Sequence, residues 1–535
     1  MASTTFVRAQ VAGISSSSEG LDINFDINVY ESTINNIAAS VNAGPNRTVQ
    51  DAIPVQKIYG VNKDRMSPTI WQEMEGQFCV TGGCSACRQS EWSLATYLGQ
   101  EATNAAFKQH WESWLTQEDV DGIVAAKLNT VRLPLPFWII EDIVDRTHEP
   151  YAQGGLDELI RGLTMFSQAG LNVILDHHAL PGVAASDQMF AGNCTKQVEF
   201  YSSASTPLLP DYNYKRAVTW SIVMAFLSHA HPEFATVFTI EAVNEPIQDA
   251  SQTPGLGRFE TAFVLGVRAI EYLLGITCDD TNPLEATGVL NNNITLPALI
   301  DAIPIIKKLV VQYDLPGDTA ESDWGTLVGQ NGQLSSGKLG AFLHGKRTCL
   351  STSFMDQGWQ YKGGPANPAS AAIGPQIYDN HMYFNFGGVA PSATELSYMQ
   401  TLCNISTIAQ ETGAGNTPLY TGEWSLATAF NTTTVFLKQW GDAQKLAWAG
   451  AGGAGWVFWN WKVEQDAKTN PIPGAYLQWS YKDALAAGVF TADPAEYFDP
   501  NVCTVSHLVD TTRGDPYEDP QTFLNSAANS GTGAA

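Results

Sequence analysis

Two kinds of hydrophobic pattern alternate along most of the chain. Short apolar runs rich in β-branched residues are typical of buried strands in a parallel sheet. Eight such runs cover residues 57–62, 129–135, 172–178, 237–245, 348–354, 375–383, 418–424 and 455–461. Between them, apolar residues recur at helical spacing in segments 101–128, 156–169, 214–229 and 259–274. Strands that alternate with helices in this number predict an α/β protein built as a closed (β/α)8 TIM barrel.

The segments outside this pattern predict the domain organisation. Residues 1–55 are rich in Ser, Asn and Ala and are expected to form an N-terminal extension, and residues 526–535 a disordered tail. Residues 56–525 are expected to form one barrel domain. Segments 277–293, 323–340 and 362–374 are rich in Gly, Pro, Asn or Asp and are expected to be loops.

Charge and composition narrow the classes of partner. The net charge is −26, and 44% of the residues are hydrophobic, which is typical of a globular protein. Nucleic acids and anionic membranes would be repelled by this charge, so neither is expected as a partner. No run of about 18 apolar residues predicts a membrane span. A neutral polymer such as a polysaccharide would not be repelled.

The cysteines and the glycosylation motifs favour a secreted protein. Eight cysteines are widely scattered, which is typical of disulfides in an extracellular protein, and the close group Cys79, Cys84 and Cys87 lacks a nearby fourth ligand for zinc. Asn-X-Ser/Thr motifs begin at Asn46, Asn193, Asn293, Asn404 and Asn431 and predict a glycoprotein. The first residues show no signal peptide, so secretion implies that a signal was removed or that export is unconventional. We expect a secreted or cell-wall monomer without metal or cofactor.

Two of the strand-like runs end on a glutamate. Glu245 lies in the stretch Thr-Ile-Glu-Ala-Val-Asn-Glu-Pro at 239–246, and Glu423 lies in Pro-Leu-Tyr-Thr-Gly-Glu-Trp-Ser at 418–425. The carboxyl ends of barrel strands form the reactive face of this fold, so the two carboxylates are expected to face each other there. Paired carboxylates perform glycosidic bond cleavage, one as acid/base and one as nucleophile. The alternative is that each glutamate merely ends a strand or caps a helix.

Other polar side chains close the neighbouring strands. Arg132 interrupts an apolar strand and is expected to pair with Glu423 and lower its pKa, unless it belongs to a structural ion pair. The pair His177 and His178 suits hydrogen bonds to sugar hydroxyls, and Asn244 could hold a sugar 2-hydroxyl. Further candidates are His381 and Tyr383, which alternation places on one face, and Trp459, which is either the floor of the sugar site or a core residue.

Together these motifs resemble glycoside hydrolase family 5, in clan A of the (β/α)8 glycosidases. More narrowly, the stretches Leu-Asn-Thr-Val-Arg-Leu-Pro, Val-Ile-Leu-Asp-His-His-Ala-Leu-Pro-Gly and Gly-Trp-Val-Phe-Trp-Asn-Trp-Lys resemble the fungal exo-β-1,3-glucanase-like branch. The resemblance implies a retaining β-glucan hydrolase with Glu245 as acid/base and Glu423 as nucleophile. It implies that the reacting sugar is bound by Arg132, His178, Asn193, Asn244, His381, Tyr383 and Trp459. Phe386, with Phe190 as a second candidate, is implied to clamp the leaving sugar.

Departures from the family pattern keep several activities open. The segment Gly-Val-Asn-Lys-Asp-Arg-Met at 60–66 replaces the usual Gly-Val-Asn-Leu-Gly-Gly-Trp, and Asp-His-His-Ala replaces Asp-Leu-His-Gly. An exo-β-1,3-glucanase is the main prediction. The alternatives are a β-1,6-glucanase, another β-glycosidase, a transglycosylase, and a non-catalytic carbohydrate-binding protein, which would be expected to lack one of the two glutamates.

Overall fold

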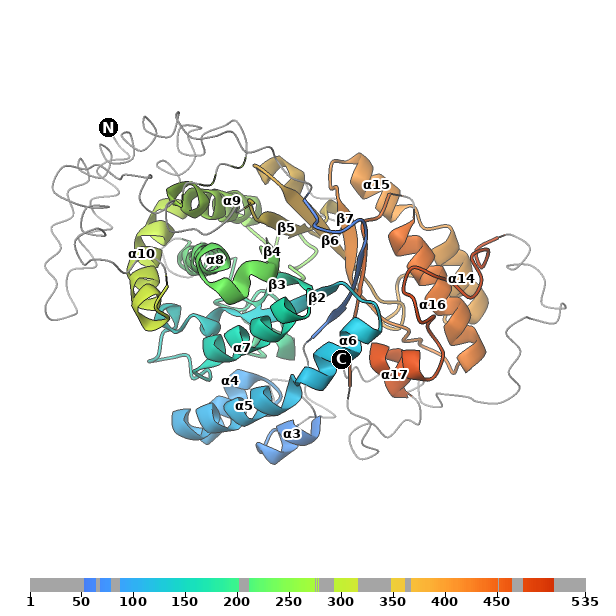
Figure 1. The fold of residues 1–535 in the computed structure, drawn as a ribbon, viewed down its shortest axis with the longest axis horizontal. Coiled ribbons are helices and arrows are strands. Elements are labelled where there is room, and N and C mark those ends of the chain that lie inside the picture. The colour runs from blue at the N-terminus through green and yellow to red at the C-terminus, as the bar shows by residue number, and fades with distance from the viewer. Residues whose placement is uncertain are drawn as a thin grey trace, which may run out of the picture.

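A closed barrel of parallel strands forms the centre of the protein (Figure 1). The computed structural model describes residues 52–63, 68–77, 87–201, 211–274, 276, 278, 293–315, 348–360, 367–450, 452–463 and 475–504. The strands are β1 (Ile58–Asn62), β2 (Thr130–Pro136), β3 (Asn172–Ala179), β4 (Val237–Glu241), β5 (Ser351–Met355), β6 (Gln376–Met382), β7 (Leu419–Trp424) and β8 (Gly455–Phe458). Each strand pairs in parallel with the next, and β8 pairs with β1 to close the barrel. The predicted fold class is confirmed.

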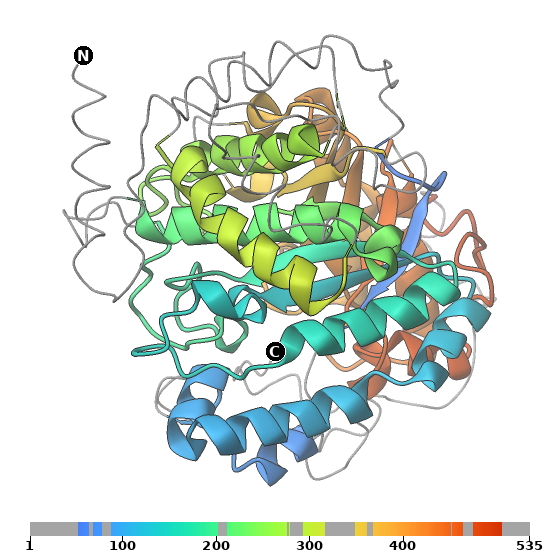
Figure 2. The same cartoon turned by 60° about the vertical axis from the view of Figure 1, so that its left-hand side comes forward.

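Helices pack around the barrel. They are α3 (Pro68–Glu73), α4 (Glu91–Leu98), α5 (Gln100–Trp114), α6 (Gln117–Ala125), α7 (Gly155–Gln168), α8 (Tyr212–Ala230), α9 (Leu256–Leu273), α10 (Thr295–Gln312), α13 (Gln357–Gln360), α14 (Glu395–Cys403), α15 (Thr407–Gly413), α16 (Thr434–Ala449) and α17 (Tyr481–Ala486). Helices α8, α9 and α10 cover one side, α14 and α16 the other, and α3, α4 and α5 lie together at one edge (Figures 1 and 2). The main hydrophobic core fills the space between strands and helices.

Two predicted elements differ from the structure in an informative way. The helical pattern over 101–128 is two helices, because Thr116 caps α6 in a reciprocal capping box with Asp119 and Leu115 is extended. The strand predicted to reach Glu245 ends at Glu241. Glu245 lies four residues later with a φ of 38°, a value that a strand cannot contain and that strains a residue with a side chain. The other predicted strands and helices are present within a few residues of their expected bounds.

The barrel interior is apolar at one end and charged at the other. Near the N-terminal ends of the strands, a small cluster contains Ile58, Ile174, Ile377, Tyr420, Ala454 and Val457. Ala52, Ile53 and Val55, at the end of the expected N-terminal extension, pack against this cluster. Further along the strands the buried side chains are Arg132, Asp176, Glu241, Asp379 and Glu423. Charges buried in a barrel interior must be paired, so this end requires a dense network of ion pairs.

Disulfides tie outer segments together. Cys278 is bonded to Cys349 and Cys403 to Cys503. Cys87 and Cys194 are also disulfide-bonded, and no free cysteine occurs among the described residues. The expectation of disulfides is confirmed.

Several segments that were predicted from the sequence lie wholly or partly outside the residues that the structure describes. Residues 1–51, the tail 526–535, the loop 323–340 and most of 277–293 lie outside the described residues. Of the expected loop 362–374, residues 367–374 are described and contain the short 3-10 helix η7 (Pro368–Ala371). Among the helices that the structure describes, none has the length and apolar character needed to cross a membrane.

Candidate active site

Glu245 and Glu423 lie together at the mouth of the barrel. Glu423 belongs to β7, and Glu245 follows β4, so the parallel barrel brings both to the same end. One carboxylate oxygen of each lies within 4.8 Å of the other, and each of these oxygens also lies within 4.8 Å of a ring nitrogen of His381. The side chain of Glu423 is 6% exposed and that of Glu245 is 22% exposed. The pair is therefore close, and Glu245 is the more accessible of the two.

Two donors fix the carboxylate of Glu423. Arg132 Nη1 donates to Oε1 over 2.9 Å, and the hydroxyl of Tyr383 donates to Oε2 over 2.9 Å. The predicted pairing of Arg132 with Glu423 is confirmed. Because each oxygen accepts from a separate group, the carboxylate is held in one orientation.

Arg132 also contacts three further carboxylates, which were not predicted from the sequence, and two asparagines. Its guanidinium lies 3.1 Å from Asp176, 3.1 Å from Glu241 and 3.4 Å from Asp379. It also donates to Oδ1 of Asn62 over 3.1 Å and to Oδ1 of Asn244 over 2.9 Å. Four carboxylates thus surround one fully buried cation. Alternation could have revealed two of them, because Asp176 and Asp379 lie two residues before His178 and His381 and share their strand faces.

His381 connects the two candidate carboxylates. A register shift between β6 and β7 at Asn380 and His381 places His381 opposite Glu423. Its Nδ1 lies 2.8 Å from Oε1 of Glu245 and 3.6 Å from Oε2 of Glu423, and its Nε2 lies 3.4 Å from Asp379. Burial lowers the pKa of His381, but the charges of Glu423 and Asp379 raise it well above the usual value for histidine. His381 therefore carries a proton that Nδ1 donates to Glu245.

The pKa values of both glutamates depend on this shared histidine. Burial raises the pKa of Glu245, but the hydrogen bond and charge of His381 outweigh burial, so the pKa lies below its usual value. Burial raises the pKa of Glu423 above its usual value and Glu245 adds to this, although His381 and Arg132 act in the opposite direction. Arg132 acts to lower the pKa of Glu423, as predicted, but burial outweighs this charge, so the pKa is not lowered overall. Glu245, Glu423 and His381 titrate as one unit.

His178 and Trp459 lie together at the mouth of the barrel. Their rings stack with centroids 5.8 Å apart, and His178 Nδ1 lies 2.6 Å from the buried carboxylate of Asp176. His177, the other member of the predicted histidine pair, does not belong to the site. Strand alternation turns its ring away from the barrel, where it stacks on Trp220 of α8 at 4.0 Å.

The remaining candidates lie on loops around the mouth. Asn193 follows the short 3-10 helix η5 (Met189–Ala191) and is half-buried, and no hydrogen bond joins its side chain to the carboxylate pair among the described residues. The same loop contacts the site through Phe190, whose ring lies 5.3 Å from that of His178. Phe386 is 56% exposed and lies 5.7 Å from the ring of Tyr383. Trp359, which was not predicted from the sequence, contacts the ring of His381 edge-on at 5.5 Å.

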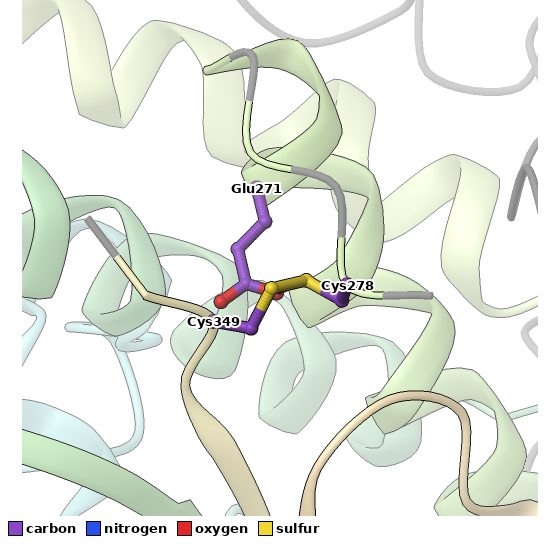
Figure 3. A group of neighbouring side chains, drawn as sticks. All are labelled: Glu271, Cys278 and Cys349. Atoms are coloured by element: carbon purple, nitrogen blue, oxygen red, sulfur yellow. A yellow bond between two sulfur atoms is a disulfide. The ribbon is translucent and has the colours of Figure 1, made fainter. Parts of the chain in front are cut away.

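Three groups of side chains have metal-ligand spacing among the described residues. In the group of Glu271, Cys278 and Cys349, the two sulfur atoms are bonded to each other and offer no thiolate (Figure 3). The other two groups share His381 with either Glu241 and Asp379 or Glu245 and Glu423. Their carboxylates contact Arg132 or His381, whose positive charges would repel a cation. This arrangement suits acid/base and nucleophilic chemistry by the carboxylates themselves.

Several known proteins are similar to this chain over most of its length. "Probable glucan endo-1,6-beta-glucosidase B" of Neosartorya fischeri is 29% identical over 456 residues, covering 82% of this chain and 87% of the relative. "Glucan endo-1,6-beta-glucosidase B" of Emericella nidulans is 28% identical over 499 residues, covering 89% and 95%. "Probable glucan 1,3-beta-glucosidase A" of Neosartorya fischeri is 26% identical over 419 residues, covering 77% and 83%.

A family model described as cellulase, glycosyl hydrolase family 5, matches residues 97–465. The match includes β2 to β8, and with them Arg132, Glu245, His381 and Glu423. Because it covers more than half of the chain, this protein belongs to glycosyl hydrolase family 5.

Proposed function

We propose that this glycoside hydrolase cleaves β-1,6-linked glucan within the chain and retains the configuration of the sugar. The β-1,6 linkage is supported by the similarity to two fungal proteins named as glucan endo-1,6-beta-glucosidases, over 82% and 89% of this chain. The similarity to a glucan 1,3-beta-glucosidase is lower and shorter. The β-1,6 alternative of the sequence analysis is therefore better supported than the main prediction of an exo-β-1,3-glucanase.

The spacing of the carboxylates supports retention. Retaining glycosidases hold their two carboxyl groups about 5–5.5 Å apart, whereas inverting enzymes need about 6.5–9.5 Å to admit a water molecule. One oxygen of Glu245 and one of Glu423 lie within 4.8 Å of each other, which is closer to the spacing of retaining enzymes than to that of inverting ones. Glu423 is accordingly assigned as the nucleophile and Glu245 as the acid/base.

The first step forms a covalent intermediate. Glu423 attacks the anomeric carbon while Glu245 donates a proton to the departing glycosidic oxygen, so one C–O bond forms as another breaks. Arg132 and Tyr383 hold both oxygens of Glu423, which restricts the attack to one direction. The hydrogen bond from His381 to Glu245 is a route by which the proton of His381 reaches the acid.

In the second step, Glu245 acts as a base and no longer as an acid. Glu245, now ionised, takes a proton from water, which attacks the anomeric carbon and releases Glu423. Two displacements at the same carbon leave the product in the β configuration. The partial exposure of Glu245 agrees with a group that must meet water and a leaving group.

The bonded cysteines support an extracellular location. Disulfides persist in oxidising compartments, and each cysteine whose state the structure describes is disulfide-bonded. We therefore also propose that the protein acts outside the cell.

Product analysis on two glucans tests the proposal. The enzyme should release a ladder of oligosaccharides from pustulan, a β-1,6-glucan, and much less sugar from laminarin, a β-1,3-glucan. Proton NMR of the first product should show the β-anomer. Glucose released from laminarin as the main activity would support the exo-β-1,3 alternative instead, and early α-anomer would exclude the double displacement. Binding without any product would indicate a carbohydrate-binding protein.

A further inference from the structure

Strand β7 contains a bulge at Gly422, directly before the candidate nucleophile. Asn380 of β6 pairs with Thr421 of β7, whereas the next pair along the strands is His381 with Glu423. Gly422 therefore has no partner residue on β6. One extra residue of this kind reverses the alternation of side chains beyond it.

The bulge turns Glu423 into the barrel. Tyr420 belongs to the apolar cluster inside the barrel, and strict alternation from Tyr420 would place Glu423 on the outer face of β7. Because Gly422 is inserted between them, Glu423 shares the inner face with Tyr420 and reaches Arg132. A one-residue change of register would turn this carboxylate away from the site. The direction of the Glu423 side chain therefore depends on the groups that hold the bulge.

Two side chains bind the peptide groups of Gly422. Its N–H donates to Oδ1 of Asp379 over 2.6 Å, and its carbonyl accepts from Nδ2 of Asn62 over 2.8 Å. A Cβ atom at Gly422 would collide with both carboxylate oxygens of Asp379, so this carboxylate lies directly against the bulge. A buried peptide N–H that lost its acceptor would raise the free energy of the folded state. Asp379 therefore stabilises the bulge.

The other oxygen of Asp379 faces the histidine that binds Glu245. Oδ2 lies 3.4 Å from Nε2 of His381 and 3.4 Å from Nε of Arg132. Nδ1 of the same imidazole lies 2.8 Å from Glu245. An anion beside Nε2 favours the ring with a proton on each nitrogen, so Nδ1 keeps the N–H that faces Glu245. Asp379 is fully buried and acts on the site only through such neighbours.

We propose that Asp379 is a positioning residue for both candidate catalytic carboxylates. Through the bulge at Gly422 it holds Glu423 turned into the barrel, and through His381 it keeps a proton directed at Glu245. The inference rests on the proposed function, because it assigns Asp379 to the reaction of these two glutamates. A purely structural role, in which Asp379 only balances buried positive charge, would affect neither glutamate in this way.

Asp379→Asn separates the two contacts of the carboxylate. The amide oxygen can still accept from the N–H of Gly422, but an amide N–H₂ replaces the oxygen that faces His381. We expect kcat for polysaccharide to fall about 10²-fold with little change in KM, because Asp379 touches no substrate. The pKa of His381 should fall by about one unit or more. Arg132 keeps its contacts with three other carboxylates, so the variant should fold.

A ¹⁵N NMR titration of the histidine rings measures the pKa of His381. The chain contains nine histidines, and the signal of His381 is the one that is absent in His381→Gln. The other charged groups around this ring and its partners stay unchanged; they are Arg132 of β2, Asp176 and His178 of β3, Glu241 of β4, Glu245, and Glu423 of β7. The matched control is Asp442→Asn, because Asp442 is a buried carboxylate near Lys445 of α16. It should change neither kcat nor the titration.

Gly422→Ala tests the bulge. The added Cβ must displace either the carboxylate of Asp379 or the bulge itself. We expect the first step on an aryl glycoside with a good leaving group to slow about 10²-fold or more, because Glu423 is misdirected. Asp379→Asn should spare this step, which needs little protonation by Glu245. The control Gly413→Ala, where an added Cβ meets no atom within 4 Å, should keep the wild-type rate.

Three results would overturn the assignment. An unchanged titration of His381 in Asp379→Asn would show that Asp379 does not hold its proton. A wild-type first step in Gly422→Ala would show that the bulge does not direct Glu423. An equal loss of kcat in Asp442→Asn would show that any buried aspartate has the same effect. A wild type that cleaves neither glucan would contradict the proposed function, whereas the NMR titration would still decide whether Asp379 holds the proton of His381.

Discussion

Arg132 donates from Nη1 to Oε1 of Glu423 over 2.9 Å, although the same guanidinium contacts three other buried carboxylates. Desolvation makes each of these buried charges costly, and their mutual attraction offsets the cost only when the geometry is complete. The contact between Arg132 and Glu423 therefore has two consequences. It fixes the orientation of Glu423, and it lowers the pKa of Glu423, although burial outweighs this effect and raises the pKa above its usual value.

Removal of the candidate nucleophile should abolish turnover while the fold remains. Glu423→Gln keeps the shape of the side chain but removes the charge that attacks the anomeric carbon. We expect a loss on the order of 10⁴-fold or more in kcat, with glucan binding retained. The control Glu118→Gln, at a side chain that is 86% exposed, should keep wild-type kinetics. A 2-deoxy-2-fluoro glucoside with a good leaving group should label Glu423, and a label found elsewhere by peptide mapping would refute the assignment.

Glu245→Ala should separate the acid role from the base role. Aryl glucosides with good leaving groups need little protonation, so their first step should be spared, whereas polysaccharide cleavage should fall by about 10²–10⁴-fold. Added azide should restore turnover of the aryl substrate, because it attacks the glycosyl-enzyme without a general base. The product should be a β-glycosyl azide. Full activity of the variant on polysaccharide would contradict the role of Glu245.

Activity should follow a bell-shaped pH profile with an acidic optimum, about pH 4–6, set by the coupled carboxylates. His381 lowers the pKa of both Glu245 and Glu423, so its removal should raise both. Both limbs of the profile of His381→Gln should therefore move to higher pH, by about one unit or more. The control His148→Gln, at a ring that is 78% exposed, should leave the profile in place. A shift to lower pH in His381→Gln would show that this imidazole is not a cation in the folded enzyme.

Stability should also depend on pH through Asp356, which follows β5. Burial raises the pKa of Asp356 to about 7, although Asn380 and the N–H of Trp359 donate to it. The folded protein therefore binds this proton more tightly than the unfolded chain. The stabilisation from the bound proton is complete below about pH 4 and is lost as the pH rises to about 7, up to about 4 kcal/mol.

Asp356→Asn removes this titration. Between pH 4 and pH 7, its free energy of unfolding in urea should fall less than that of the wild type. The control Asp121→Asn, at an exposed position of α6, should follow the wild type. Parallel curves for Asp356→Asn and the wild type would show that Asp356 ionises normally.

The sequence by itself determined the barrel and its reactive end. Strand and helix periodicity are local properties, and in a parallel barrel the ends of the strands must meet at one face. The predictions that Glu245, Glu423, Arg132, His381 and Tyr383 lie together there follow from this, and the structure confirms their proximity. The motifs also indicated the family, although the linkage favoured from the sequence was not the one that the relatives support.

The tertiary structure decided how charge is shared. Asp176, Glu241 and Asp379 come from three different strands, and only barrel closure brings them to one guanidinium. The register shift between β6 and β7 places His381 between the two glutamates, and the φ of Glu245 carries its side chain beyond the end of β4. Electrostatics and packing depend on distances between segments far apart in the chain, which no local pattern specifies.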